Sequence, residues 1–283
     1  MNNRVVVLGS CSVCHVFTSP ELPARGETLI GDDYHIVVGG KGSGQAIVAQ
    51  KLGGDVFLLE RLGDDAYGRA EKQSYEEMGM HTEFVHLDTK TPTGSAGIFL
   101  DANGQNKIVV VPGANGQVSC SDVDCLRETI AGAKILGAQL EVPLETVDHA
   151  IRIAAALGVR TMLDPAPVAP IDESLYPCIS IMKPNEREAQ LLTGVPVTDS
   201  ETAAEAARIL LNKGVREAVI ITEFRSPVVG RVGLGAGITV LNSVKIIQRI
   251  IISGLQAAAL SAQNSFPVKG HSSHLLSGMR RYL

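Results

Sequence analysis

A glycine-rich stretch with a single lysine, residues 39–46 (GGKGSGQA), is the part of the sequence best suited to hold a ligand. Glycines let the backbone turn sharply and let a ligand approach the main chain without a Cβ in the way. We predict a helix over residues 46–52, and the unpaired N–H groups at a helix N-terminus suit a polar or anionic ligand. The spacing fits neither a P-loop, because His35 replaces its first glycine and Gly42 follows the lysine, nor a dinucleotide fingerprint.

Short apolar runs alternate with amphipathic segments along most of the chain. The apolar runs predict buried strands at residues 5–8, 56–59, 135–140, 160–163, 179–182 and 218–222. The amphipathic segments predict helices at residues 46–52, 67–78, 121–131, 143–156, 186–192 and 202–213. This alternation indicates an α/β fold with a parallel sheet covered by helices.

Polar side chains follow four of these predicted strands. They are Gln139 and Glu141, Asp164, Lys183 and Asn185, and Thr222 and Glu223. Ligands of open α/β sheets bind outside the carboxyl ends of the strands, so these residues indicate a site independently of any motif. Each residue alone has a plainer interpretation, since Asn185 could cap a helix with Glu188 completing a capping box. For four strand ends together, a binding edge is the better interpretation.

Residues 27–38 and 94–111 break this pattern, because apolar and polar residues alternate there around turn signals. Such alternation is typical of antiparallel strands with one exposed face. We expect them to form a small sheet that projects from the main domain as a lid. An apolar lid face would also allow two copies of the chain to pair as a homodimer.

Composition narrows the class of protein. A net charge of −5, the absence of tryptophan and an aromatic content of 4% argue against nucleic acid as a partner. The N-terminus is too short in apolar residues for a signal peptide, and no apolar run reaches the ~18 residues of a membrane span. Five cysteines without a secretory signal fit the cytoplasm. Cys11 and Cys14 are spaced as C-x-x-C but follow a strand instead of opening a helix, so a redox pair is disfavoured.

Several motifs together resemble the ribokinase-type sugar kinases, the phosphofructokinase-B family, over about residues 5–222. Their sequences are GGKG at residues 39–42, GDDAYG at 63–68, PGAN at 112–115, QLEVP at 139–143, DPAP at 164–167 and KPNERE at 183–188. The resemblance implies a ribokinase-like α/β sandwich with a lid, and ATP- and Mg²⁺-dependent phosphorylation of a sugar hydroxyl.

The resemblance also implies roles for individual residues. Gly40, Lys41 and Glu141 would contact the sugar. Asn185 and Glu188 would serve the phosphate and Mg²⁺ region, with Glu188 acting through water, and Thr222 would lie near the nucleotide.

Three positions where the family holds sugar hydroxyls differ in this chain. Ser12 and Cys14 stand where the family usually carries Asn-x-Asp, and Gly44 replaces an Asn of the glycine motif. A site that lacks a hydrogen-bonding partner for a hydroxyl discriminates strongly against that hydroxyl. We therefore expect ribose to fit poorly and a bulkier or less polar substrate to fit better.

The family's C-terminal motif, whose glycines form an anion hole and whose Asp is the general base, is missing. No Asp or Glu follows Glu223, and the glycines of residues 233–237 precede a β-branched run, which favours a hairpin turn. We therefore divide the chain into a ribokinase-like domain, residues 1–222, and a divergent segment, residues 223–283.

Three explanations compete: a truncated or frame-altered kinase, a non-catalytic descendant that binds sugar or nucleotide, and a kinase with a different base. The abrupt end of the match favours the first, so we expect little kinase turnover.

Overall fold

The computed structural model describes residues 3–222 and, as backbone only, residues 238–242. Within these residues, eight strands form one sheet in which every neighbouring pair is parallel, which confirms the predicted parallel sheet. In spatial order the strands are β12 (Ile238–Asn242), β11 (Glu217–Thr222), β10 (Ile181–Met182), β9 (Arg160–Asp164), β8 (Ile135–Gln139), β1 (Arg4–Leu8), β4 (Asp55–Gly63) and β5 (Val85–Asp88).

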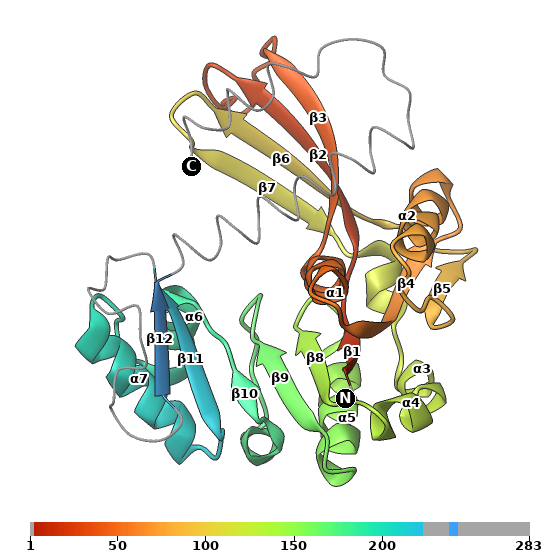
Figure 1. The fold of residues 1–283 in the computed structure, drawn as a ribbon. Coiled ribbons are helices and arrows are strands. Elements are labelled where there is room, and N and C mark those ends of the chain that lie inside the picture. Colours follow the sequence, from red (N-terminus) through yellow and green to blue (C-terminus); the bar gives the residue numbers. More distant parts are fainter. Residues whose placement is uncertain (1–2, 223–237, 243–283) are drawn as a thin grey trace.

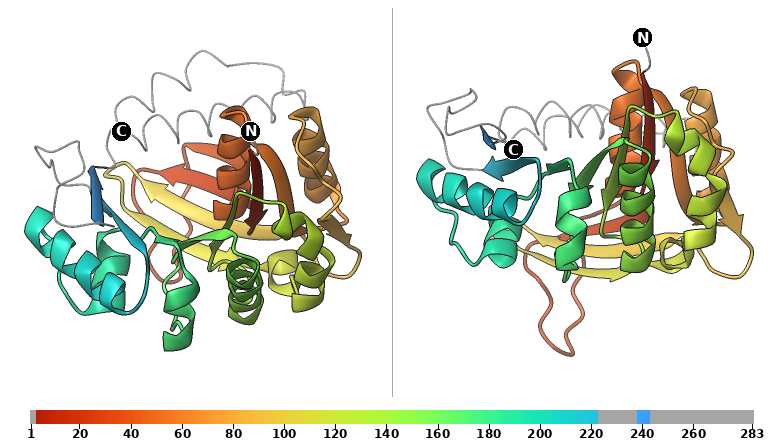
Figure 2. Two further views of the ribbon diagram at one scale, coloured as in Figure 1. Left: turned by 60° about the horizontal axis from the view of Figure 1, so that its bottom comes forward. Right: turned by 90° about the horizontal axis from the view of Figure 1, so that it is seen from below.

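Helices cover both faces of this sheet (Figure 2). On one face lie α1 (Lys41–Lys51) and α2 (Ala66–Glu77), and on the other α5 (Leu144–Ala156) packs against β8 and β9. The remaining helices are α3 (Cys120–Cys125), α4 (Arg127–Ala131), α6 (Glu186–Thr193), α7 (Ser200–Asn212) and the 3₁₀ helices η1 (Gly113–Gln117) and η2 (Glu173–Cys178).

The apolar face of α5 shows why the sequence folds in this way. Val147, Ala150, Ile151 and Ala154 recur at helical spacing, and each is at most 1% exposed. They pack into the same core as the central strands, where Leu136 of β8 is fully buried. The resulting core fixes the positions at which the strands end.

A smaller, four-stranded sheet projects from the carboxyl-end side of the large sheet (Figure 1). Its order is β3 (Asp33–Gly39), β2 (Ser12–Ser19), β6 (Gly94–Asp101) and β7 (Asn106–Val111). The prediction of a projecting sheet is confirmed, with three corrections. The first of the two expected segments becomes a strand only at Asp33, β2 was not predicted, and β2 pairs with β6 in parallel, so the sheet is mixed.

One further prediction was wrong in detail. Helix α1 begins at Lys41 and not at residue 46, so Gly42 and Gly44 are helical and not part of a turn. β12, which follows the glycine-rich residues 233–237, is parallel to β11. The glycines of residues 233–237 themselves, and the rest of the divergent segment except β12, lie outside the described residues.

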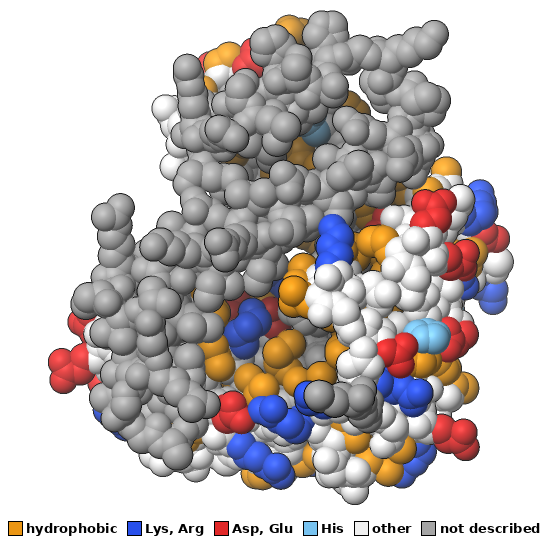
Figure 3. Space-filling view, viewed as in Figure 1, with side chains coloured by type: hydrophobic (Ala, Val, Ile, Leu, Met, Phe, Trp, Pro, Cys, Tyr) orange, Lys and Arg blue, Asp and Glu red, His pale blue; other side chains and the backbone are white. Residues whose placement is uncertain are grey.

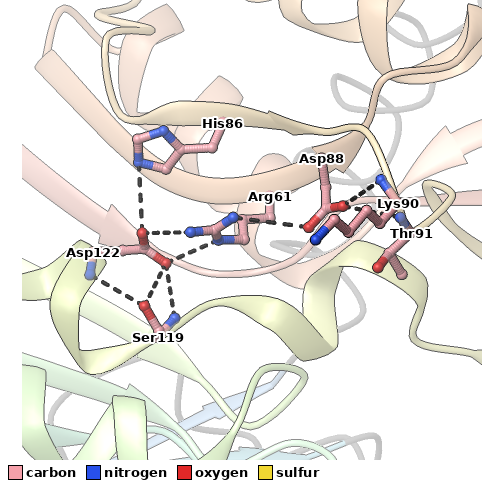
Figure 4. A network of polar contacts seen from close by, with 7 residues as sticks. All are labelled: Arg61, His86, Asp88, Lys90, Thr91, Ser119 and Asp122. Atoms are coloured by element: carbon pink, nitrogen blue, oxygen red, sulfur yellow. Dashed lines mark hydrogen bonds and ion pairs between the residues drawn. The ribbon is translucent and has the colours of Figure 1, made fainter.

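A network of ion pairs and hydrogen bonds connects β4, β5 and α3 (Figure 4). The guanidinium of Arg61 donates to both carboxylate oxygens of Asp122, at 2.9 and 2.7 Å, and lies 3.8 Å from Asp88. Asp122 also closes a capping box with Ser119 at the start of α3. Burial alone would raise the pKa of Asp122, but the hydrogen bonds from Arg61 and Ser119 lower it below its ordinary value.

Candidate functional site

The carboxyl end of β8 meets the start of α1 at Glu141. One oxygen of this carboxylate, Oε2, accepts from Ser10 Oγ at 2.5 Å and from the backbone N–H of Lys41 at 3.1 Å. Its other oxygen lies 3.9 Å from Lys41 Nζ. The arrangement leaves a half-buried carboxylate and an exposed ammonium side by side at the positive end of a helix, which suits a hydroxyl-rich ligand.

Close backbone packing explains why glycines occupy the start of α1. A Cβ on Gly42 would lie 2.4 Å from the nitrogen of Ser10, and a Cβ on Gly40 would lie 2.3 Å from the Ser10 carbonyl oxygen. Gly40 also has a φ of 139°, which L side chains rarely adopt. Gly44 is different, because a Cβ there would meet nothing within 4 Å. Thus Gly40 and Gly42 are required by the fold, whereas Gly44 leaves open space.

A second cluster joins the ends of β9 and β10 to α1. Asp164 Oδ2 accepts from Gln45 Nε2 at 3.0 Å and lies 2.9 Å from Lys183 Nζ. Gln139 continues the chain of contacts by donating to Gln45 Oε1 at 2.7 Å. Asp164 is 8% exposed, so its ion pair with Lys183 is substantially desolvated.

Asn185 and Glu188 form a capping box at the start of α6, which is the plainer of the two interpretations that the sequence allowed for Asn185. The Asn185 backbone N–H and side-chain amide each donate to Glu188 at 2.8 Å. Burial raises the pKa of Glu188, and the Asp164 charge adds to this, while the Asn185 N–H, Lys41 and Lys183 oppose it. Glu188 therefore lies within electrostatic reach of both clusters described above.

Thr222 ends β11 next to this capping box. Ile221 donates its backbone N–H to the Pro184 carbonyl at 2.9 Å, which places the end of β11 beside Asn185. The Thr222 side chain is fully buried.

Ser12 and Cys14 come from the lid, on β2. Strand alternation places both on one face of the small sheet, with Cys14 opposite Val37 of β3 and Ala96 of β6. Burial raises the pKa of the Cys14 thiol, and the charge of Glu141 raises it further. This face of the lid is therefore the one that lies near Glu141. Ser12 Oγ accepts from Asn115 Nδ2 at 3.3 Å. The lid thus presents a neutral thiol and aliphatic groups to the carboxylate.

The structure brings nearly all of the predicted site residues to one edge. Ser10 and Gln45 are the contacts that sequence reasoning missed. Ser10 directly follows the Gly9 after β1, and that position at the end of a buried strand was a usable signal. Gln45 carried no signal beyond its place in the glycine-rich stretch.

The residues fit Mg²⁺ only in the manner of an ion that keeps several waters. No group of three or more His, Cys, Asp or Glu side chains in the described part of the chain could hold a metal. Mg²⁺ is commonly bound by one or two carboxylates together with water and substrate phosphates. Glu188, whose pKa is raised mainly by burial, is a carboxylate whose charged form a cation would favour.

Acidic and basic side chains are interspersed on the described part of the surface in Figure 3, without a continuous basic area. Among residues 3–222 and 238–242, no helix combines the length and hydropathy needed to span a bilayer.

Comparison with known proteins gives consistent similarities. A family model described as pfkB family carbohydrate kinase matches residues 2–226. A ribokinase of Haemophilus influenzae is 33% identical, covering 95% of this chain and 97% of that protein. A deoxyribokinase of Salmonella typhi is 36% identical over 76% of this chain and 71% of its own length. The structure of Arabidopsis thaliana ribokinase complexed with ribose and ATP superposes with a TM-score of 0.71 at 26% identity, covering 95% of this chain and 94% of that one.

Proposed function

The chain belongs to the pfkB family of carbohydrate kinases, and on that premise we propose that it transfers the γ-phosphoryl group of ATP to a hydroxyl of a sugar. The observation that carries this proposal is the meeting of Glu141, Lys41 and Ser10 beneath the lid. Charged hydrogen-bonding groups at a helix N-terminus can orient a sugar hydroxyl. A lid that covers them excludes water from the transferred group.

The nucleotide occupies the neighbouring strand ends in this proposal. Asn185 pairs with Ile221, the residue before Thr222, and both Asn185 and Thr222 would contact ATP, as family resemblance implies. Glu188 would hold Mg²⁺ through water, and the ion would neutralise charge on the phosphates. The charges of Lys41 and Lys183 both lower the pKa of Glu188. In this proposal they supply positive charge between the sugar and the nucleotide.

The reaction needs a group that takes the proton of the attacking sugar hydroxyl as ADP leaves. Three carboxylates of this edge, Glu141, Asp164 and Glu188, are the candidates among the described residues. Phosphoryl transfer depends mainly on positioning and charge stabilisation, so a surrogate base would give slow but measurable turnover.

The substrate in this proposal is a pentose with fewer hydroxyls than ribose, such as 2-deoxyribose. Cys14 and Gly44 offer no strong hydrogen-bonding side chain, and the space at Gly44 is open. A relative of 36% identity is a deoxyribokinase. Ser12 would contact the remaining hydroxyls.

Two broader features complete the proposal. Residues 1–222 form the kinase domain, and residues 223–283 are a divergent replacement of the family's catalytic end. The proposal places the protein in the cytoplasm, which five free cysteines support.

The lid also pairs two copies of the chain. On the face of the lid that does not carry Cys14, three large apolar side chains are partly exposed: Phe17 is 41%, Ile36 38% and Phe99 38% exposed.

A coupled ADP-release assay with D-ribose and 2-deoxy-D-ribose tests the function. We expect sugar-dependent ADP release, faster with 2-deoxy-D-ribose, at a turnover below the ~1–100 s⁻¹ typical of kinases. Turnover within that range would contradict the expectation of slow turnover and show that this chain supplies a fully competent base. Thermal stabilisation by either sugar without any ADP release would refute the kinase proposal in favour of a binding protein.

The variant Glu141→Gln tests the sugar contacts. It keeps acceptors for Ser10 and Lys41 but loses the charge, so we expect KM for the sugar to rise ~10–100-fold, the worth of a charged hydrogen bond. An unchanged KM would place the sugar elsewhere.

A further inference from the structure

The chain passes from the body to the lid through three residues, Gly9, Ser10 and Cys11, between β1 and β2. Figure 1 shows this connection rising between α1 and α2. The Ser10 carbonyl accepts from the backbone N–H of Ser43 in α1 at 3.0 Å. Asn115 holds the main chain of Cys11 on both sides, with contacts of 3.0 and 2.7 Å. This connection therefore carries both Ser10, a partner of Glu141, and the start of β2.

Two buried carboxyl groups lie beneath this connection. Glu60 of β4 is 0% exposed and Glu71 of α2 is 7% exposed, and Cys11 and Tyr75 are fully buried beside them. Among the described residues, neither oxygen of Glu60 has a hydrogen-bond partner of ordinary geometry, while the Tyr75 hydroxyl is near enough to lower the pKa of both carboxyls in part. The sugar-site contacts described above use none of these side chains.

Among the residues whose side chains the structure describes, 3–222, no positive charge balances the pair. The titratable groups that face Glu60 and Glu71 in this part of the chain are Cys11 from the β1–β2 connection and Tyr75 from α2. Arg61, the next residue on β4, directs its guanidinium to Asp122 instead. An unpaired carboxylate is strongly disfavoured in a buried site, so the group neutralises by holding a proton.

The pKa values support this protonation. Burial and the neighbouring Glu71 charge raise the pKa of Glu60 to about 8, and burial raises that of Glu71 to about 7. The same surroundings hold the pKa of the Cys11 thiol well above its ordinary value, mainly through burial. Its packing between Ser43 and Tyr75 therefore involves a neutral thiol.

We propose that the buried Glu60–Glu71 pair is a positioning element of the sugar site, which holds the lid connection and the start of α1 in place only while it carries a proton. With the proton bound, Cys11 packs between α1 and α2. When both carboxyls ionise, they repel each other and draw water, and the Cys11 connection loosens together with Ser43. The link to the sugar rests on the proposed function, whereas the protonation and the loosening do not.

The direction of the pH effect follows from the raised pKa values. An unfolded Glu ionises near pH ~4.3, while the folded pair keeps its proton to higher pH. The folded state therefore binds more protons between these limits, and stability falls as pH rises from about 4.5 to about 8.

Thermal unfolding of the full chain between pH 5 and 9 tests the protonation. We expect the wild-type Tm to fall with rising pH by several degrees more than that of Glu60→Gln or Glu71→Gln, because glutamine imitates the neutral acid. Glu77→Gln, an exposed position on α2, is the control and should follow the wild type. Parallel profiles for the wild type and both buried variants would overturn the proposal.

Amide hydrogen exchange tests the positioning without any substrate. At pH 6.5, residues 9–12 and 41–45 should exchange equally in the wild type and Glu60→Gln. At pH 9 they should exchange ~10-fold faster in the wild type, since one pH unit beyond a pKa changes the protonated fraction about tenfold. Because the two proteins are compared at the same pH, intrinsic exchange cancels. Equal exchange at pH 9, even with different Tm profiles, would reduce the pair to a purely structural role and refute the positioning.

A comparison of Tm profiles in potassium chloride and in tetramethylammonium chloride, at equal ionic strength, tests whether the buried pair holds a proton or a metal cation. A proton predicts the same wild-type Tm profile in both salts. A profile that moves with K⁺ would show that the pair holds a metal cation and would overturn the proposal.

Discussion

Lys183 and Gln45 contact the same oxygen of Asp164, at 2.9 and 3.0 Å, although one follows β10 and the other lies on α1. Asp164 thereby joins the end of β10, next to the proposed nucleotide site, to the helix that carries Lys41. A carboxylate so placed can hold the two halves of the site in register, whether or not it also takes the proton.

Replacing Asp164 should therefore affect catalysis more than stability. In Asp164→Asn, Lys183 loses its counter-charge while Gln45 keeps an acceptor. We expect kcat/KM to fall ~10–100-fold, as for the loss of a charged hydrogen bond.

The matched control is Glu217→Gln, which breaks the ion pair of Glu217 with Arg160 at the start of β11. That pair is about half exposed on both sides, so kcat/KM should stay unchanged. A similar loss in both variants would show that Asp164 acts only through general stability.

The substitution Gly44→Asn should change substrate preference. A side chain there meets open space and the backbone is helical, so the variant should fold at least as well as the wild type. An added amide could hydrogen-bond a sugar hydroxyl, and one such bond is worth about 2–10-fold in affinity.

We expect the ratio of kcat/KM for D-ribose to that for 2-deoxy-D-ribose to rise by this factor. Gly44→Ala, which adds a methyl group without an amide, is the control. The same ratio in both variants would remove Gly44 from substrate selection.

The substitution Arg61→Gln should destabilise the protein in a pH-dependent way. It removes two hydrogen bonds to Asp122, and because the Arg61 side chain is 25% exposed we expect a loss of about 1–3 kcal/mol, less than for a fully buried pair. The folded pKa of Asp122 is lowered, so its stabilisation is present above pH ~4 and is lost as pH falls through the folded pKa.

Urea unfolding at pH 7 and at pH 3 measures this difference. The wild type and Arg61→Gln should differ clearly at pH 7 and converge at low pH. An equal difference at both pH values would mean that Arg61 stabilises by packing alone.

If two lids pair as proposed, the molecular mass of the protein in solution should depend on Phe17. The stacked rings of Phe17 and Phe99 lie 5.4 Å apart on the exposed face of the lid. We expect sedimentation of the wild type as a dimer and of Phe17→Lys as a monomer, because a buried lysine in an apolar interface is strongly disfavoured. A wild-type monomer would refute the dimer.

Sequence alone predicted the elements that depend on local pattern. Val5–Leu8 could be assigned to a strand because a continuous apolar run is typical of a strand buried on both faces. The capping box of Asn185 and Glu188 was predictable because its two residues lie one helical turn apart.

What the sequence did not predict depends on contacts distant in the chain. Helix α1 begins at Lys41 despite its glycines because close packing of Gly42 on Ser10 fixes the helix there, against weak intrinsic propensity. The contact of Ser10 with Glu141 spans most of the domain. Glu60 interrupts an apolar strand, and only the fold shows that it faces Glu71.

The parallel pairing of β2 with β6 bears on the order of folding. Ser12 pairs with Gly94, so the lid joins two excursions of the chain that are separated by α1, β4, α2 and β5. Closing so long a loop has an entropic cost that only a folded body can offset. The lid should therefore form after the body, and a nascent chain that ends before Gly94 would expose β2 with only β3 as its neighbour.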